Sequence, residues 1–242
     1  MKKWSLLVVG LFLSVLLSAQ NETIVSDKEA EIRDLKDFHG VKIAGSIDLF
    51  ISQGPKEVVA VSASSQEVKD DIITEVKDGI LNVHPKKGSN WWKMGWNTIG
   101  KRIRVYVAAR NIDYINSAGS GNIIISGEIK ADKLEFIVAG SGNIEGAINT
   151  ETLSVDQSGS SNVRLRGNSK SSNFNMSGSG NLYSYDLVTE NTDIDISGSG
   201  NVEITSNKEV NAKISGSGNI RIKGNADLRT VSTSGSGHVR RV

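Results

Sequence analysis

Apolar and polar residues alternate along most of the chain, and a Gly-Ser-Gly turn interrupts the alternation at regular intervals. The six-residue units are AGSGNI (twice), SGSSNV, SGSGNL, SGSGNV, SGSGNI and SGSGHV. Their first glycines follow one another at spacings of 21, 19, 19, 20, 18 and 19 residues: Gly119, Gly140, Gly159, Gly178, Gly198, Gly216 and Gly235. Self-similarity at such a period indicates a stacked solenoid, in which each repeat packs on its neighbours.

The alternation predicts two strands per repeat, one on each side of the turn. Four residues before each first glycine stands an apolar column: Ile115, Phe136, Val155, Phe174, Ile194, Ala212 and Val231. Four residues after it stands another: Ile123, Ile144, Val163, Leu182, Val202, Ile220 and Val239. Alternate side chains of a strand share one face, so parallel stacking would bury these columns on one another. Residues 111–242 therefore predict an all-β fold, a right-handed parallel β-helix with coils of about 19 residues.

Asparagine stands three residues after the first glycine in six of the seven repeats. Stacked coils would place these side chains in a column at about 4.8 Å per coil. Each amide could then donate a hydrogen bond to the next carbonyl, so we expect a structural ladder of Asn122, Asn143, Asn162, Asn181, Asn201 and Asn219. His238 takes this place in the seventh repeat, and we interpret it with Arg240 and Arg241 as a polar cap of the last coil.

Residues 20–110 follow a looser pattern. The stretch "VKIAGSIDLFIS" contains a degenerate form of the turn at residues 44–47, and "EVVAVSA", "DGILNVHP" and "KRIRVYVAA" alternate as strands. Two arrangements are open. Either the solenoid begins irregularly in this part, or a small antiparallel unit caps its amino-terminal end.

The amino terminus has the pattern of a secretory signal peptide. Lys2 and Lys3 precede an uncharged apolar run over residues 4–17, which is too short to span a bilayer, and small or polar residues follow with a cleavage site near Ala19. A retained membrane anchor is the alternative. We expect residues 1–19 to be removed, the mature chain to have no transmembrane segment, and the protein to be exported to the periplasm, the outer surface or the extracellular space.

Composition narrows the range of partners. The chain has no cysteine, so it forms no disulfide and carries no lipid-modified cysteine. Removing the signal peptide reduces Lys+Arg from 28 to 26 against 27 Asp+Glu, which gives a formal charge of about −1. Nucleic acid is therefore not indicated as a partner. The histidines His39, His84 and His238 lie far apart and form no metal-binding motif, and no cofactor is expected.

One copy of the repeat, taken alone, resembles a phosphate-binding loop. A dinucleotide fingerprint needs a third glycine three residues after the second, at the start of a helix. That position holds Ile124 in the first repeat, and a strand follows it. The turns are therefore expected to be corners of the solenoid.

The iterated SGSGN units, the signal peptide, "VKIAGSIDLFISQG" and "VKDGILNVHP" together resemble the head GIN domain family, whose members carry the name "putative autotransporter adhesin". The resemblance covers residues 38–242. It implies a secreted β-helical protein of Gram-negative bacteria with a role in adhesion. It transfers no catalytic residues.

Two outward columns carry candidate chemistry. Asp156 and Asp195 stand three residues before their glycines and would lie two coils apart, about 9.6 Å, near the upper end of carboxyl separations in inverting glycosidases. Asn175 between them and Lys213 beyond favour a charge-compensated ladder instead. On the other side of the turn, a basic and aromatic surface for a sugar or an anionic glycan would comprise Arg164, Arg166, Tyr183, Tyr185, Arg221 and Lys223.

The segment "GSNWWKMGWNTIG" is the other candidate contact region. It holds Trp91, Trp92, Met94 and Trp96 between two strand patterns. Such residues either cover the open end of the solenoid or contact a glycan, a partner chain or a second copy.

These patterns predict a secreted, non-enzymatic β-helical scaffold for extracellular or cell-surface interaction, similar to an adhesin. Its partner would be a glycan or a cell-surface protein, and a homo-oligomer is possible. Two alternatives are a carbohydrate-processing enzyme that uses outward carboxylates and a structural surface protein that assembles with itself.

Overall fold

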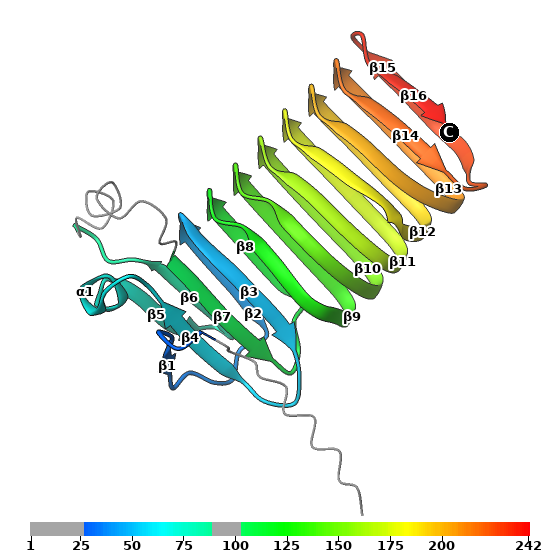
Figure 1. Ribbon diagram of the computed structural model, residues 1–242. Coiled ribbons are helices and arrows are strands. Elements are labelled where there is room, and N and C mark those ends of the chain that lie inside the picture. The colour runs from blue at the N-terminus through cyan, green and yellow to red at the C-terminus, as the bar shows by residue number, and fades with distance from the viewer. Residues whose placement is uncertain (1–26, 89–102) are drawn as a thin grey trace, which may run out of the picture.

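The computed structural model describes residues 27–88 and 103–242. The predicted signal peptide and the tryptophan segment with Trp91, Trp92, Met94 and Trp96 lie outside these residues. The described chain forms strands and one short helix, and it confirms the predicted parallel β-helix with coils of about 19 residues (Figure 1). Its elements are β1 (Glu31–Arg33), β2 (Gly40–Gly45), β3 (Ile47–Gln53), β4 (Val58–Ser62), α1 (Gln66–Asp70), β5 (Ile72–Lys77), β6 (Ile80–Pro85), β7 (Ile103–Ala109), β8 (Tyr114–Gly119), β9 (Ile123–Gly140), β10 (Ile144–Gly159), β11 (Asn162–Gly178), β12 (Asn181–Gly198), β13 (Asn201–Gly216), β14 (Asn219–Lys223), β15 (Asp227–Ser234) and β16 (His238–Arg241).

Each of the long strands β9 to β13 runs from one Gly-Ser-Gly corner to the next and passes through both layers of a flattened coil (Figure 1). We call the layer after the corner the front sheet; it contains β7, β3, the first parts of β9 to β13, β14 and β16. The back sheet precedes the corner and contains β6, β2, β8, the last parts of β9 to β13, and β15. The strands of successive coils pair in parallel, with each corner glycine opposite the next.

The core lies between the two sheets. The columns before and after the corner are buried as the alternation predicts, except in the last coil, where Val231 is exposed and Val239 is half-buried. One continuous hydrophobic cluster extends from Phe38 to Ala226 and includes both the amino-terminal part and the repeats. Among the residues that the structure describes, the amino-terminal part and the repeats therefore share one core.

The amino-terminal part contains a coil that is out of sequence order. Strand β2 lies between β6 and β8, and β3 lies between β7 and β9, all in parallel. The coil formed by residues 40–53 thus separates two coils that are consecutive along the chain. Gly45 pairs with Gly119, so the degenerate turn at residues 44–47 is a true corner of the stack.

Antiparallel strands cover the amino-terminal end of this stack. On the front sheet β4 pairs antiparallel with β7, and β1 pairs antiparallel with β4. On the back sheet β5 pairs antiparallel with β6, and α1 connects β4 to β5. Both arrangements left open by the sequence are therefore present: an irregular start of the solenoid and an antiparallel cap outside it.

Candidate functional site

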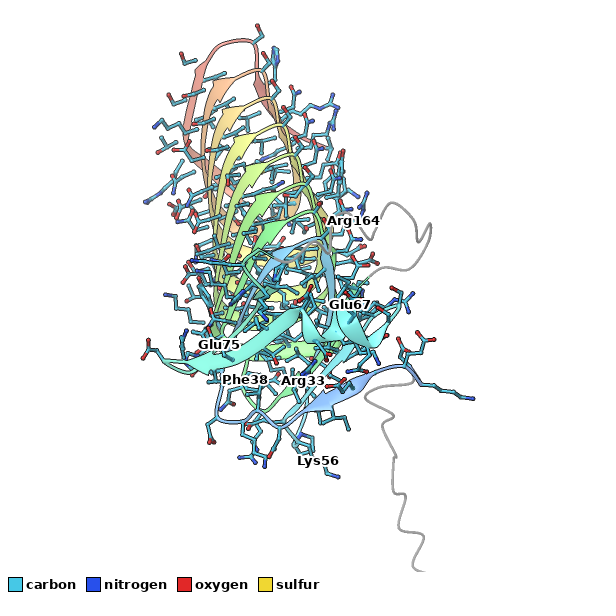
Figure 2. All side chains as sticks on the ribbon, turned by 90° about the vertical axis from the view of Figure 1, so that its left-hand side faces the viewer. Arg33, Phe38, Lys56, Glu67, Glu75 and Arg164 are labelled. Atoms are coloured by element: carbon cyan, nitrogen blue, oxygen red, sulfur yellow. The ribbon has the colours of Figure 1, made fainter. Side chains whose placement is uncertain are left out.

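The outer surface of the front sheet brings together the basic and aromatic residues that the repeat pattern places there. We call this surface the front face. It comprises Glu145, Arg164, Arg166, Tyr183, Tyr185, Glu203, Thr205, Arg221, Lys223 and Arg240, on β10 to β14 and β16. The alternation of the strands turns these side chains outward, as at Arg164, whose neighbours Val163 and Leu165 fill the core. Figure 2 shows Arg164 on the outside of the solenoid.

Two tyrosine rings of the front face are in contact with cations. The guanidinium carbon of Arg164 lies 5.2 Å from the ring centroid of Tyr183, one coil away. The Nζ atom of Lys223 lies 4.1 Å from the ring centroid of Tyr185, two coils away. Such contacts stabilise by about 0.5–1 kcal/mol at exposed sites. Tyr183 remains 37% exposed, so the pair lies at the surface.

A salt bridge joins two further residues of the front face. An Nη atom of Arg221 donates a hydrogen bond to a carboxylate oxygen of Glu203 at 2.9 Å. Burial, followed by the nearby charge of Glu203, raises the pKa of Tyr185, while Arg221 and Arg240 act in the opposite direction. The phenol of Tyr185 is therefore neutral at physiological pH and can donate a hydrogen bond to a ligand.

The predicted asparagine positions form a continuous hydrogen-bonded column beside the corner. Each side-chain Nδ2 donates to the Oδ1 of the preceding coil, at 3.1, 3.0, 3.0, 2.9 and 3.1 Å from Asn143 to Asn219. The column begins at Asp48 in the out-of-order coil, whose carboxylate accepts from the backbone N–H and the side chain of Asn122. It fixes the register between coils, which positions the rows of the front face.

Replacing Asn162 by leucine is expected to lower the free energy of unfolding by about 2 kcal/mol, because the amide of Asn181 and the carbonyl of Asn143 both lose their partner in a half-buried site. Urea denaturation measures the change. The control is Asn149→Ala, an exposed asparagine on β10, which should cost less than about 0.5 kcal/mol. Equal stabilities of the two variants would contradict a structural role of the column.

The two candidate carboxylates of the back sheet, Asp156 and Asp195, already have partners. The side-chain amide of Asn175 donates to Asp156 at 2.7 Å, and Lys213 lies 3.5 Å from Asp195. The register aligns Asp156, Asn175, Asp195 and Lys213 in one row across four coils. This is the arrangement of a charge-compensated ladder, in which both carboxylates serve to hold neighbouring coils together.

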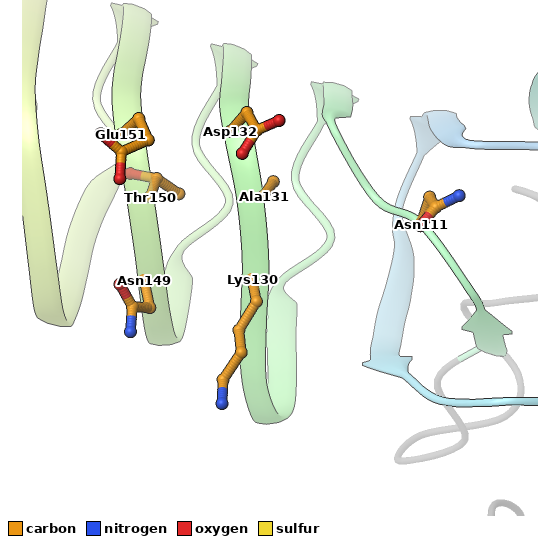
Figure 3. A pocket seen from close by; sticks show the side chains of 7 residues that line it. All are labelled: Asn111, Lys130, Ala131, Asp132, Asn149, Thr150 and Glu151. Carbon is orange, nitrogen blue, oxygen red and sulfur yellow. The ribbon is translucent and has the colours of Figure 1, made fainter.

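An open recess of about 420 Å³ lies where β9 and β10 turn from the front to the back sheet (Figure 3). Its lining residues are Asn111, Lys130, Ala131, Asp132, Asn149, Thr150 and Glu151. Lys130 is paired with Glu128 at 3.3 Å, and Glu151 with Lys170 at 2.5 Å. Lys130 and Glu151 thus already form ion pairs within the protein, and Asp132 is the other carboxylate of the recess. The recess therefore has fewer unpaired charged groups for a ligand than the front face has.

Across residues 27–88 and 103–242, no group of three or more His, Asp or Glu side chains could hold a metal ion. In the same part of the chain, no helix has the length and apolar character needed to cross a membrane.

Solved structures similar to this protein come from several bacteria. A "putative adhesin" from Bacteroides fragilis NCTC 9343 is 21% identical with a TM-score of 0.78, and the match covers 89% of this chain and 98% of that one. A "putative lipid binding protein" from Parabacteroides distasonis ATCC 8503 is 25% identical with a TM-score of 0.67 over the same shares. A "putative adhesin" from Parabacteroides merdae ATCC 43184 is 18% identical with a TM-score of 0.62, over 88% and 95%.

The sequence also matches a family model over most of its length. No curated protein matches the chain at a significant level. The model described as "Putative auto-transporter adhesin, head GIN domain" matches residues 37–226, from the out-of-order coil to the sixth repeat. This range contains all of β2 to β14. The protein therefore belongs to the auto-transporter adhesin, head GIN domain family.

Proposed function

We propose that the protein is a secreted, non-enzymatic scaffold that binds glycans or proteins at a cell surface through its front face. The observation that carries this proposal is the concentration of Arg164, Arg166, Tyr183, Tyr185 and Lys223 on a flat outer surface. The adhesin name of the family supports a role in interaction. The signal-peptide pattern of residues 1–19 supports export, and the partners of Asp156 and Asp195 favour a scaffold over a hydrolase.

Many modest contacts along a rigid surface would supply the affinity in this proposal. The stacked coils repeat the front face at about 4.8 Å per rung, and the asparagine column holds the rungs in register. A partner that contacts several rungs at once binds far more tightly than a partner that contacts one rung. After the first contact has formed, the later contacts are intramolecular and form at a high effective concentration. A shallow surface is sufficient for this mode of binding.

A binding screen on a panel of glycans and extracellular proteins tests the proposed function. We expect the purified protein to bind at least one member, and the double variant Tyr183→Ser/Tyr185→Ser to bind it at least tenfold more weakly, because both cations lose their ring partner. The matched control is Asn173→Ser on the back sheet, an exposed residue whose loss should leave binding unchanged.

Two results would contradict the proposal. One is equal binding by the wild type and the tyrosine variant to every member of the panel, or no binding at all. The other is hydrolysis of a polysaccharide that is lost in Asp156→Ala or Asp195→Ala, which would establish the enzymatic alternative.

A further inference from the structure

The ten residues that make up the front face carry an excess of positive charge. Its cations are Arg164, Arg166, Arg221, Lys223 and Arg240, and its carboxylates are Glu145 and Glu203. Five cations less two carboxylates leave three positive charges on these ten residues, whereas the chain without the predicted signal peptide has a formal charge of about −1. The surface therefore attracts anions more strongly than the average surface of the protein does.

Most of these cations are not neutralised within the described part of the protein. Arg221 forms a salt bridge with Glu203. Among residues 27–88 and 103–242, no carboxylate lies within ion-pair distance of Arg164, Arg166, Lys223 or Arg240. Four cations of the front face are thus available to an anionic ligand.

The two tyrosines hold cations in place instead of presenting bare rings. Arg164 lies over the ring of Tyr183, and Lys223 over that of Tyr185. A guanidinium held on a ring loses less side-chain entropy when it binds a carboxylate, and its planar fork matches that group. The same contacts disfavour single-stranded nucleic acid, which binds largely by stacking its bases on open aromatic rings.

The available cations lie in two adjacent rows along the axis of the solenoid, Arg164 with Arg240 and Arg166 with Lys223. Arg164 and Arg166 are on β11, Lys223 is on β14, and Arg240 is on β16. In the strand order, β14 is three positions and β16 four positions from β11, or about 14 and 19 Å. Two such rows fit a linear polymer with repeated negative groups, which can contact several rungs at once.

The opposite surface does not offer this pattern. Across β10 to β13 the row on the back sheet contains Asp156, Asn175, Asp195 and Lys213, and Lys213 is paired with Asp195. The same row continues through Ile137 and Asn116 to one further cation, Lys42 on β2. Two carboxylates in that row would repel an anionic polymer. Across β10 to β13 the front face therefore matches such a polymer better than the back sheet does.

We infer that the front face binds an acidic polysaccharide, a polymer bearing uronate carboxylates, laid along the solenoid axis across β11 to β16. This inference rests on the proposed function and names its ligand class. Arg164 and Arg166 anchor the chain at one end and Lys223 and Arg240 at the other. The rings of Tyr183 and Tyr185 hold Arg164 and Lys223 in position before the polymer binds.

Polygalacturonate is the probe for a direct test, with neutral dextran as its uncharged counterpart, by titration calorimetry at low and high salt. We expect the wild type to bind polygalacturonate and not dextran, and added salt to weaken the binding. Arg164→Gln/Arg166→Gln should bind at least tenfold more weakly with a smaller salt dependence. The control Lys213→Gln, an exposed lysine of the back sheet, should change the affinity less than twofold.

Two single substitutions separate the pre-organising role of the ring from a direct contact. Tyr183→Leu should weaken binding several-fold, because Arg164 loses the ring beneath it, whereas Tyr183→Phe should retain most of the affinity.

A third substitution, Glu145→Gln, removes a carboxylate one rung from Arg164 and should strengthen binding two- to threefold. Unchanged thermal midpoints exclude misfolding as the cause of any loss.

The outcomes distinguish this inference from the proposed function. Equal binding of dextran and polygalacturonate, or insensitivity to Arg164 and Arg166, would overturn the acidic-glycan inference and leave a front-face scaffold intact. Tighter binding of a single-stranded DNA homopolymer, or of vesicles with anionic lipid, would overturn it in favour of another class of anion. If the wild-type protein bound no member of the glycan and protein panel, both the acidic-glycan inference and the proposed function would be refuted.

Discussion

Replacing Gly140 by alanine is expected to lower the free energy of unfolding by about 3 kcal/mol, through two independent effects at one corner of the solenoid. Gly140 has a backbone φ of +134°, which residues with a Cβ rarely adopt. An added Cβ would also overlap the backbone carbonyl of Gly119 in the preceding coil. A carbonyl that belongs to a hydrogen-bonded corner cannot move aside without breaking the stack. Urea denaturation followed by circular dichroism measures the change.

The matched control for Gly140 is Gly54, the first residue after β3. A Cβ at Gly54 would meet nothing within 4 Å, so Gly54→Ala should change the stability by less than about 0.5 kcal/mol. If Gly140→Ala were as stable as Gly54→Ala, the corners would relax independently. The close approach of successive coils would then not explain why the first glycine recurs in all seven repeats.

The regular part of the fold follows from the sequence because its determinants are local. A period of two places alternate side chains in the core, and a period near 19 places equivalent residues on neighbouring coils. Phe136, Val155 and Phe174 are therefore recognisable as one buried column from the alternation and the repeat period alone. The rows of the front face follow from the same register, which explains why Arg164 and Tyr183 lie together as their spacing predicts.

The out-of-order coil could not be predicted in this way, because its neighbours are distant in sequence. Strand β3 pairs with β7 and β9, some 55 and 75 residues further along the chain, and no local period encodes this choice. A partial signal exists at the corner. Asp48 stands three residues after Gly45, at the position of the ladder asparagines, and aligning it with them would have assigned residues 40–53 to the stack.

The third repeat departs from the others at its second glycine. Its unit is SGSSN, with Ser161 where the other repeats have a second glycine. The side chain of Gln157, which points into the core, donates a hydrogen bond to the backbone carbonyl of Ser161. The backbone of the same corner thus satisfies one polar end of Gln157 in an otherwise apolar part of the core, whereas Gln157 Oε1 and Ser161 Oγ have no hydrogen-bond partner among the described residues.

Replacing Leu49 by alanine in the out-of-order coil is expected to lower the free energy of unfolding by about 3 kcal/mol, because a fully buried side chain is lost and a cavity remains. Leu49 is opposite Val105 of β7 on one side and Ile123 of β9 on the other. The coil thus couples the capped end to the repeats.

Hydrogen exchange provides the measurement that is specific to this coupling. In Leu49→Ala the amides of β7 and of the first part of β9 should lose protection together, since one missing side chain loosens contacts in both directions. The control is Ile32→Ala, which removes a side chain that is 74% exposed on β1 and should cost less than about 0.5 kcal/mol. Loss of protection in β7 alone would show that the cap and the repeats unfold separately, and that the coil of residues 40–53 belongs to the cap.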